Sequence, residues 1–368
     1  MTAPLPPCGN TFYGTDTLAS APRLFLPSIQ FGRALAATMV LYFHCGEALK
    51  KSGHDLGIST AGSAGVDIFF VISGFIIYYV SRDESPKTFF LKRLIRIVPA
   101  YWFYTSIVIF LLLFLPQLYG TLRFDGSFAL LSYLFIISET NAGTPGVALG
   151  VGWTLAFEMY FYVLATIALL ISRDKWFWVV TVAIVAGAML SVFISPPPAL
   201  IPVVSALPLE FLVGVAIARA YFSGFRLGPM SAFLSLGMGF IGLYLVGYVE
   251  LTEESFYDPA RLLFYGIPGT LIVLGLVSLN DVLRFPAFTL LIGDASYSLY
   301  LSHQFVLQAS SLVLPKLGLP ALVLLVLYIA LALAVALLSY RLIEQPSSRW
   351  LSNVAKLRRN TAPKRVRV

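Results

Sequence analysis

The chain has 368 residues, of which 58% are hydrophobic and only 12% are charged, and its mean hydropathy is +0.84. This composition excludes an ordinary soluble domain and is typical of a polytopic membrane protein. The net charge of +7 does not indicate nucleic-acid binding, because the basic residues gather where membrane topology would place them.

The segment before residue 28 contains prolines and lacks a basic stretch followed by an apolar one. We therefore expect no cleavable signal peptide, and we expect the first membrane helix to act as the insertion signal. Cys8 lies in this polar segment and Cys45 in an apolar one, so the two cysteines do not predict a disulfide framework.

Ten hydrophobic runs predict an all-α fold, a polytopic transmembrane helix bundle. In chain order they are 29–48, 66–80, 97–115, 151–171, 176–194, 202–222, 230–249, 262–279, 288–313 and 319–343. A further apolar stretch, 128–138, is too short to span, and we expect it to lie in the interface or to re-enter the protein. We expect an N-terminal tail (1–28), one membrane domain (29–346) and a basic C-terminal tail (347–368).

The distribution of Lys and Arg predicts that both termini are cytoplasmic. With that orientation, 20 of the 25 basic residues fall on the inner side of the membrane. The five on the outer side are Lys50, Lys51, Arg123, Arg261 and Lys316, and an acidic cluster at 250–258 also faces outward. Cytoplasmic loops are enriched in Lys and Arg, which favours this orientation over its inverse. We expect a multi-pass protein of the plasma membrane, which is the inner membrane if the cell is Gram-negative.

Arg33 and His44 lie within one apolar helix. Their separation of eleven residues is about 20° beyond three full turns, so both side chains share a face, roughly 16 Å apart along the axis. Ionisable groups at membrane depth usually face a cavity or one another. The pair suggests a lined path, with an anion held at Arg33 and proton chemistry at His44. Alternatively, Arg33 extends to lipid phosphates and His44 binds a neighbouring helix.

Lys92, Arg93 and Arg96 lie in the loop expected between the second and third spans, spaced to share one side of an amphipathic helix. Guanidinium forks suit phosphates, because two parallel N–H groups meet two oxygens. The cluster predicts a cytoplasmic site for a phosphate-bearing donor. The alternative is an anchor on anionic lipid.

Two further groups are expected in the outer half of the bundle beside His44. Glu158 would lie roughly 10 Å below the outer surface, and His303 falls at a similar depth in the ninth span. A buried carboxylate needs a partner or a proton, so Glu158 could orient a histidine, act as a base or only bind another helix. Three titratable groups at one depth indicate a site. Glu210 and Asp67 have weaker cases, and Asp67 could simply cap its helix.

Other patterns are structural or absent. Small residues in the segment 62–75 allow two helices to approach closely, and tight packing is the simpler reading. The sequence has no Walker loop, no Gly-x-Gly-x-x-Gly and no His-Glu-x-x-His, and the third histidine, His54, is in a loop. We therefore expect no metal site.

Together, these segments resemble acyltransferase family 3, the integral-membrane enzymes that O-acylate extracytoplasmic carbohydrates. The matching segments are Arg33 with ten residues then His44, Gly65 to Phe75, Arg93-Leu-Ile-Arg96 with Pro99, Trp153 to Glu158, Ser296 to His303, and Glu344-Gln-Pro346. They follow the family's order over about 85% of the chain, and the absence of room for an extra domain resembles the stand-alone exopolysaccharide-production type. One departure is Met159, where the family often has a second acidic residue.

The resemblance implies a role for each matching residue. Arg33, Arg93 and Arg96 would hold the phosphates of a cytoplasmic acyl-CoA, and acetyl-CoA is the usual donor. His44 would be the catalytic histidine where donor and acceptor meet, with Glu158 and His303 completing the polar site. The acceptor would be a hydroxyl of an extracytoplasmic polysaccharide or lipid-linked sugar.

Two hypotheses about function follow from the sequence. The first is an O-acyltransferase, because transfer from a thioester to a sugar hydroxyl mainly needs deprotonation of that hydroxyl, for which histidine is suited. The second is a transporter or flippase of a glycan intermediate, in which the same groups would form a permeation path. The lack of internal repeats and the clustered arginines favour the first.

Overall fold

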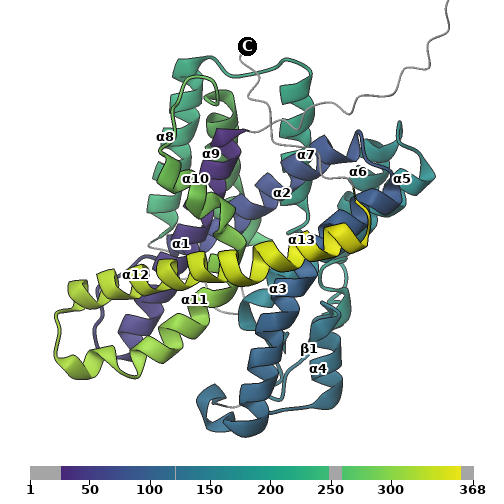
Figure 1. Ribbon diagram of the computed structural model, residues 1–368. Coiled ribbons are helices and arrows are strands. Elements are labelled where there is room, and N and C mark those ends of the chain that lie inside the picture. The colour runs from purple at the N-terminus through teal and green to yellow at the C-terminus, as the bar shows by residue number, and fades with distance from the viewer. Residues whose placement is uncertain (1–25, 121, 248–258, 358–368) are drawn as a thin grey trace, which may run out of the picture. The chain divides into compact units, whose positions relative to one another are not determined.

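The computed structural model describes residues 26–120, 122–247 and 259–357 (Figure 1). The tail before residue 26 with Cys8, the acidic cluster at 250–258 and the tail beyond residue 357 lie outside the described residues. The described chain is helical except for one hairpin of two short antiparallel strands, β1 (Ser138–Glu139) and β2 (Pro145–Gly146), in which Ser138 pairs with Gly146. The fold is all-α, as the hydrophobic runs predict.

The helices follow the order of the predicted runs. They are α1 (Pro27–Lys51), α2 (Gly65–Ser81), α3 (Pro86–Phe114), α4 (Gly126–Tyr133), α5 (Trp153–Ile171), α6 (Trp176–Leu190), α7 (Leu209–Phe222), α8 (Pro229–Val246), α9 (Ile267–Ser278), α10 (Ala287–Asp294), α11 (Ser296–Ser311), α12 (Ala321–Ser339) and α13 (Gln345–Val354). Two π-helical turns extend these helices. Leu262–Gly266 leads directly into α9, and Tyr340–Glu344 joins α12 to α13 without a break.

Five helical stretches of the described chain are long and apolar enough to cross a membrane. They are Thr60–Ser81, Pro86–Phe114, Gly150–Ile171, Pro229–Val246 and Ala321–Val354. Two shorter apolar helices, Trp176–Leu190 and Leu262–Ser278, accompany them. Because a helix satisfies its own backbone hydrogen bonds, this is the architecture of a polytopic membrane protein.

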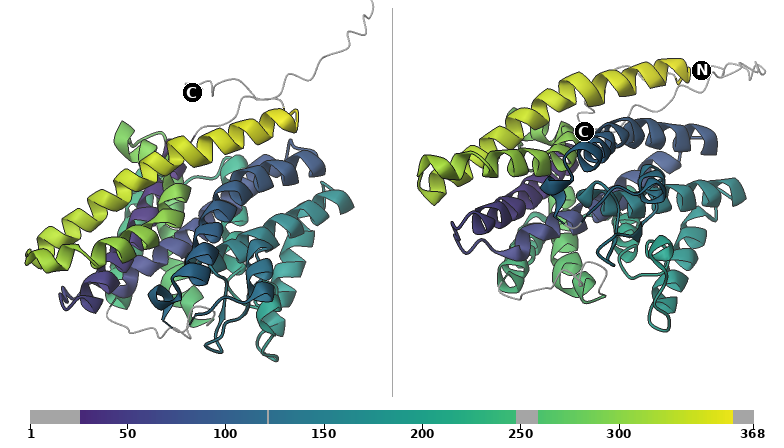
Figure 2. Two further views of the ribbon diagram at one scale, coloured as in Figure 1. Left: turned by 60° about the horizontal axis from the view of Figure 1, so that its bottom comes forward. Right: turned by 90° about the horizontal axis from the view of Figure 1, so that it is seen from below.

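Several boundaries differ from those predicted. The run 288–313 divides at Ala295 into α10 and α11, where the backbone of α10 meets that of α1: a Cβ on Gly293 would lie 2.2 Å from the Gln30 carbonyl oxygen. The run 202–222 is α-helical only from Leu209. The last helix continues through α13 to Val354 and forms one long rod that packs against α11 and α3 (Figures 1 and 2). Hydropathy finds apolar segments, but tertiary contacts decide where each helix bends or ends.

Helix α2 is at the centre of the packing and contacts α1, α5, α7 and α9. It meets α7 backbone to backbone: a Cβ on Gly74 would lie 1.9 Å from the Phe211 carbonyl oxygen, and one on Gly214 1.9 Å from that of Val71. The close approach predicted from the small residues of the segment 62–75 is therefore present. It fixes α2 as the wall that the cavities described below share.

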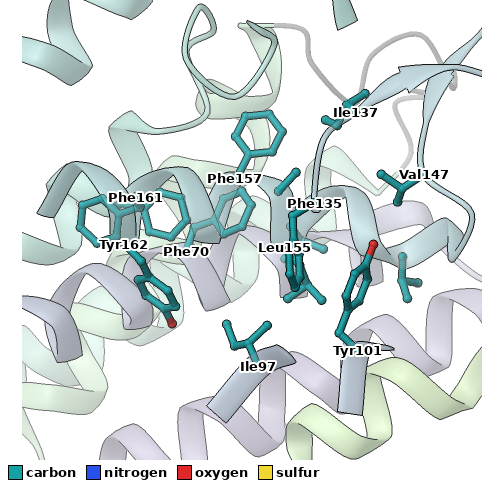
Figure 3. Packing of buried hydrophobic residues seen from close by; sticks show 14 of the residues in the cluster. Phe70, Ile97, Tyr101, Phe135, Ile137, Val147, Leu155, Phe157, Phe161 and Tyr162 are labelled. Carbon is teal, nitrogen blue, oxygen red and sulfur yellow. The ribbon is translucent and has the colours of Figure 1, made fainter. Parts of the chain in front are cut away.

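The stretch 128–138 does not span. It forms α4 and the start of the hairpin, which pack on α3 through Tyr101: its hydroxyl donates a 2.8 Å hydrogen bond to the Ser132 carbonyl, and its ring stacks on Phe135 at 4.2 Å. Figure 3 shows this cluster, with Tyr101 and Phe135 on one side and the rings of Phe70 and Phe161 on the other.

Candidate active site

A cavity of about 100 Å³ lies between α1, α2, α3, α5 and α11, and we call it the arginine cavity. Arg33, Arg93, Arg96 and Glu158 all line it. The remaining wall is largely apolar, with hydroxyl groups from several helices, and consists of Val66, Phe69, Phe70, Ile72, Ser73, Ile76, Ile77, Ile97, Thr154, Leu155, Tyr162, Ser296, Tyr297 and Tyr300. Figure 3 shows part of this wall, with Phe70, Ile97, Leu155 and Tyr162 labelled.

Arg93 and Arg96 belong to the continuous helix α3, and the prediction of a separate loop before the third span is wrong. Pro99 lies inside this helix and cannot donate to the carbonyl of Ile95. Ser348 of α13 donates a 3.2 Å hydrogen bond to that carbonyl instead. Because a neighbouring helix satisfies the freed group, α3 passes the proline unbroken and carries both arginines into the bundle.

Lys92, the third basic residue of the cluster, does not line the arginine cavity. Its ammonium forms a 2.5 Å ion pair with Glu84. The structure therefore separates the two arginines from the lysine, although sequence spacing places all three on one side of a helix.

Arg33 joins α1 to α11 across the arginine cavity, since its Nη2 donates a 2.9 Å hydrogen bond to Ser296 Oγ. The charges that act on it come from Arg96 and from the carboxylates of Glu344, Glu158 and Asp294. A cationic group facing a cavity and partly balanced by carboxylates can hold an anion there, because guanidinium N–H groups bind phosphate and carboxylate oxygens directly.

Glu158 is held in the same cavity by two hydroxyl groups. Ser73 Oγ donates to its Oε1 at 3.3 Å, and the Tyr162 hydroxyl, one turn further along α5, donates a short hydrogen bond to the same oxygen. The expected grouping of Glu158 with both histidines is not found, since neither histidine lines the arginine cavity. Depth counted along a helix does not fix which neighbour a side chain faces.

His44 and His303 lie together, with ring centroids 5.0 Å apart. His303 is only 1% exposed, and its Nδ1 lies 3.0 Å from the Leu299 carbonyl oxygen. A carbonyl only accepts, so Nδ1 carries the hydrogen and Nε2 is left as an acceptor. Nε2 has no hydrogen-bond partner within the described part of the chain. The two histidines thus form a pair, as predicted, with one ring nitrogen of His303 available.

His44 lines a second cavity, of about 970 Å³. We call it the hairpin cavity because β2 and the turn between β1 and β2 form part of its wall. Its walls come from α1, α2, α5, α11 and the segment 140–151. They are Val40, Phe43, Ser63, Val66, Thr140, Thr144, Pro145, Gly146, Val147, Gly150, Val151, Trp153, Arg261, Tyr300 and Gln304. Its volume is at the upper end of the range found for small-molecule sites, so the cavity has room for a ligand beside His44.

The two cavities share Val66 and Tyr300 in their walls. The Tyr300 hydroxyl contacts Thr154 Oγ1 at 2.9 Å and donates to the Val151 carbonyl at 3.1 Å, and its ring centroid is 6.0 Å from that of His303. Val66 and Tyr300 therefore form a partition between the two cavities, with Arg33, Arg93 and Arg96 on one side and His44 on the other. Sequence reasoning assigned no role to Tyr300, although it lies within the segment containing His303.

Asp67 and Glu210 belong to a buried ionic cluster rather than to either histidine. Arg261 Nη2 forms a 2.6 Å ion pair with Asp67, and their side chains are 3% and 0% exposed. Glu210, 1% exposed, is close enough for the charges of Asp67 and Arg261 to act on it, and neither of its carboxyl oxygens has a hydrogen-bond partner among the described residues. Arg261 also lines the hairpin cavity, a placement that its position in an expected outer loop did not reveal.

Glu344 is the other site residue that sequence reasoning left without a role. It is buried, accepts a 2.6 Å hydrogen bond from Ser298 and acts electrostatically on Arg33. The sequence feature that could have pointed to Glu344 is the segment Glu344-Gln-Pro346. It follows the last predicted hydrophobic run, but in the structure it continues the last helix. Among the described residues, no three or more His, Cys, Asp or Glu side chains gather as metal ligands.

Comparison with known proteins identifies the family of the chain. Residues 26–341 match the acyltransferase 3 family model, described as an acyltransferase domain, so the chain belongs to this family and is an acyltransferase. It is 31% identical over 322 residues to the exopolysaccharide production protein ExoZ of Rhizobium meliloti (strain 1021), covering 83% of this chain and 94% of ExoZ.

More distant relatives carry related names. The peptidoglycan O-acetyltransferase OatA of Listeria monocytogenes serovar 1/2a is 26% identical over 363 residues, covering 88% of this chain and 56% of OatA. The acyltransferase MdmB of Streptomyces mycarofaciens is 25% identical over 320 residues, covering 77% of this chain and 79% of MdmB. No solved structure matches the chain.

Proposed function

We propose that this enzyme moves an acyl group, acetyl in the first instance, from cytoplasmic acyl-CoA to a hydroxyl of an extracytoplasmic polysaccharide or lipid-linked sugar. The observation that carries the proposal is the shared wall at Val66 and Tyr300, with three arginines on one side and His44 on the other. The names of ExoZ and OatA, which refer to exopolysaccharide production and peptidoglycan O-acetylation, support a glycan acceptor.

The proposed topology has ten crossings with both termini in the cytoplasm of a plasma-membrane protein. The 20-to-5 division of basic residues supports it. The arginine cavity then faces the cytoplasm, where acyl-CoA is made, and the hairpin cavity faces the outer side. Membrane lipids surround the bundle, and the donor is a substrate rather than a resident cofactor.

The donor would bind with its phosphates on Arg33, Arg93 and Arg96. Its thin pantetheine arm would then extend through the mostly apolar cavity toward the partition at Tyr300. Holding the thioester in this way converts an encounter of two molecules into a positioned reaction, which lowers its entropic barrier.

Chemistry would occur where the acyl carbonyl passes Tyr300 and meets the acceptor. His44 takes the proton of the sugar hydroxyl, the oxygen forms a bond to the acyl carbon, and the carbon–sulfur bond breaks. The proton then goes to the departing thiolate, which leaves as the thiol of coenzyme A. His303, through its free Nε2, would orient His44, and Glu158 would set the charge around the arginines.

The experiment that tests the function uses purified protein reconstituted into vesicles with labelled acetyl-CoA and an acceptor glycan. We expect label in the glycan with the parent protein, and at least about a 100-fold lower rate with His44→Ala, the loss typical of removing a general base. Coenzyme A should raise the unfolding temperature of both proteins, because the arginines remain. Equal transfer rates with His44→Ala and Glu158→Gln as with the parent would refute the site.

A further inference from the structure

A third cavity lies outside the site described above. It has a volume of about 310 Å³ and lies between the end of α2, the turn joining α5 to α6, and α7. Three arginines from these three places line it, namely Arg82, Arg173 and Arg219, so we call it the three-arginine pocket. Its other walls are Tyr78, Ser81, Leu169, Asp174, Trp176, Phe177 and Trp178.

The pocket lining brings together three guanidinium groups and one carboxyl group, that of Asp174. In the described ranges, none of the three guanidinium groups has a carboxylate oxygen within 4.0 Å. By contrast, Arg226 and Arg261 are paired with Asp281 and Asp67. Three positive charges that line the same pocket repel one another, and an anion bound between them would offset this repulsion.

Two of the arginines, Arg173 and Arg219, are held in place by contacts that leave some of their N–H groups free to bind a ligand. Arg173 donates to the backbone carbonyls of Ser81 at 2.6 Å, Arg82 at 2.5 Å and Glu84 at 2.7 Å, and so ties its loop to the end of α2. The guanidinium carbon of Arg219 lies 4.4 Å from the centre of the Phe177 ring. Stacking on a ring fixes the plane of the guanidinium while its N–H edge stays available for a ligand.

This arrangement differs from an ordinary positive-inside anchor. Basic side chains that anchor a helix extend separately toward lipid phosphates. Here, by contrast, three segments each contribute an arginine to a single pocket whose other walls are largely aromatic. The pocket and the arginine cavity are lined by neighbouring stretches of the same two helices and share no lining residue. On α2 Ile77 lines the arginine cavity and Tyr78 the pocket, and on α5 Tyr162 lines the cavity and Leu169 the pocket.

We propose that the three-arginine pocket binds a phosphate group carried by an organic ligand. Two sources present that chemistry at this end of α2. One is the nucleotide end of the acyl-CoA donor, which rests on the proposed function; the other is the headgroup of an anionic phospholipid, which does not. Arginine forks bind phosphate oxygens in pairs, and Trp176 and Phe177 supply apolar walls for the group that carries the phosphate.

The test compares Arg82→Gln and Arg219→Gln with Lys175→Gln. Lys175 is exposed in the same turn but does not line the pocket, so its variant loses one positive charge without touching the site. Arg173 is left intact because its three backbone bonds hold the loop. Thermal unfolding of each variant in detergent checks that the fold is unchanged.

Two binding measurements distinguish the sources. Calorimetry in phosphatidylcholine nanodiscs measures the affinity for coenzyme A and for 3′-dephospho-coenzyme A. Native mass spectrometry measures retention of phosphatidylglycerol against phosphatidylcholine. Loss of a charge-assisted hydrogen bond should weaken binding about tenfold or more.

Weaker coenzyme A binding in both arginine variants, but not in Lys175→Gln, would place one phosphate of the donor in the pocket, apart from those held by Arg33, Arg93 and Arg96. A parent that prefers coenzyme A over the 3′-dephospho form, with the preference lost in the variants, would assign the 3′-phosphate. Unchanged coenzyme A affinity with lost phosphatidylglycerol retention would assign the lipid, whether or not the proposed function holds. If both arginine variants match Lys175→Gln in every measurement, the pocket binds no phosphate.

Discussion

Arg261 and Asp67 form a 2.6 Å ion pair at the centre of the bundle, with almost no exposure to solvent. Arg261 precedes the π-helical turn that leads into α9, and Asp67 is in the first turn of α2, so the pair ties together segments nearly 200 residues apart. Glu210 of α7 adds a second carboxyl to the single guanidinium. The cluster therefore contains one carboxyl more than the charge of Arg261 requires.

We predict from this imbalance that the two acids differ in their effect on stability. Asp67→Asn leaves the Arg261 charge buried without its partner and should lower the free energy of unfolding by about 3–5 kcal/mol. Glu210→Gln keeps the size of the side chain and leaves the ion pair intact, so it should cost much less. Thermal unfolding in detergent measures both, and an equal loss in the two variants would contradict the charge count.

The contact between α2 and α7 gives a second prediction. Gly74→Ala would place a methyl group 1.9 Å from the Phe211 carbonyl oxygen, and backbone cannot move aside as a side chain can. We expect a loss of about 3 kcal/mol, the upper range for overpacking, or failure to fold. Gly237→Ala on α8 is the matched control, because nothing lies within 4 Å of its Cβ. A Gly74→Ala protein as stable as this control would show that the helices are not in contact there.

The hydrogen bond from Arg33 to Ser296 predicts a graded effect on donor binding. Ser296→Ala removes one acceptor but leaves the guanidinium in the cavity, so the Kd for coenzyme A should change less than tenfold, by about 1 kcal/mol. Arg33→Lys keeps the charge and loses the fork, and should weaken binding by about tenfold or more. Calorimetric titration with coenzyme A gives both values. Binding that is indifferent to Arg33→Lys would mean that Arg33 contacts no phosphate.

The tautomer of His303 leads to a prediction about rescue. If its Nε2 orients His44, a side chain with an acceptor at the Nε2 position should retain part of the transfer rate. Gln places its terminal amide near that position and Asn places it near Nδ1, so His303→Gln should be faster than His303→Asn or His303→Ala. Acetyl transfer from labelled acetyl-CoA, with coenzyme A affinity as the control for folding, provides the comparison. The same rate in all three variants would assign His303 a packing role.

The family resemblance implied the gathering of Arg33, Arg93 and Arg96. Hydropathy and motif spacing predicted the helical order and the close approach at the small residues of α2. These features depend on local chemistry: an apolar run long enough to span forms a helix, and residues three or four apart share a face. The sequence also predicted the pairing of His44 with His303, since both were placed in the outer half of their helices.

Other features depended on contacts between segments far apart in the chain. Pro99 was expected to follow a loop, and only the hydrogen bond from Ser348 to Ile95 explains why α3 continues through it. The sequence placed Arg261 in an outer loop, and only the fold shows that it forms an ion pair with Asp67. Glu158 was expected beside the histidines and instead lines the cavity of the arginines.

The sequence by itself determined that this protein is a helical membrane protein with arginine, histidine and glutamate inside the bundle, because composition and spacing are properties of each segment alone. Its resemblance to acyltransferase family 3 gave the enzyme class. Only the tertiary structure decided that Tyr300 and Val66 separate the arginines from His44, that Arg261 pairs with Asp67, and that three helix ends form a further basic pocket. The reason is geometric: a helix fixes which side chains share its face, but only packing against its neighbours fixes what that face meets.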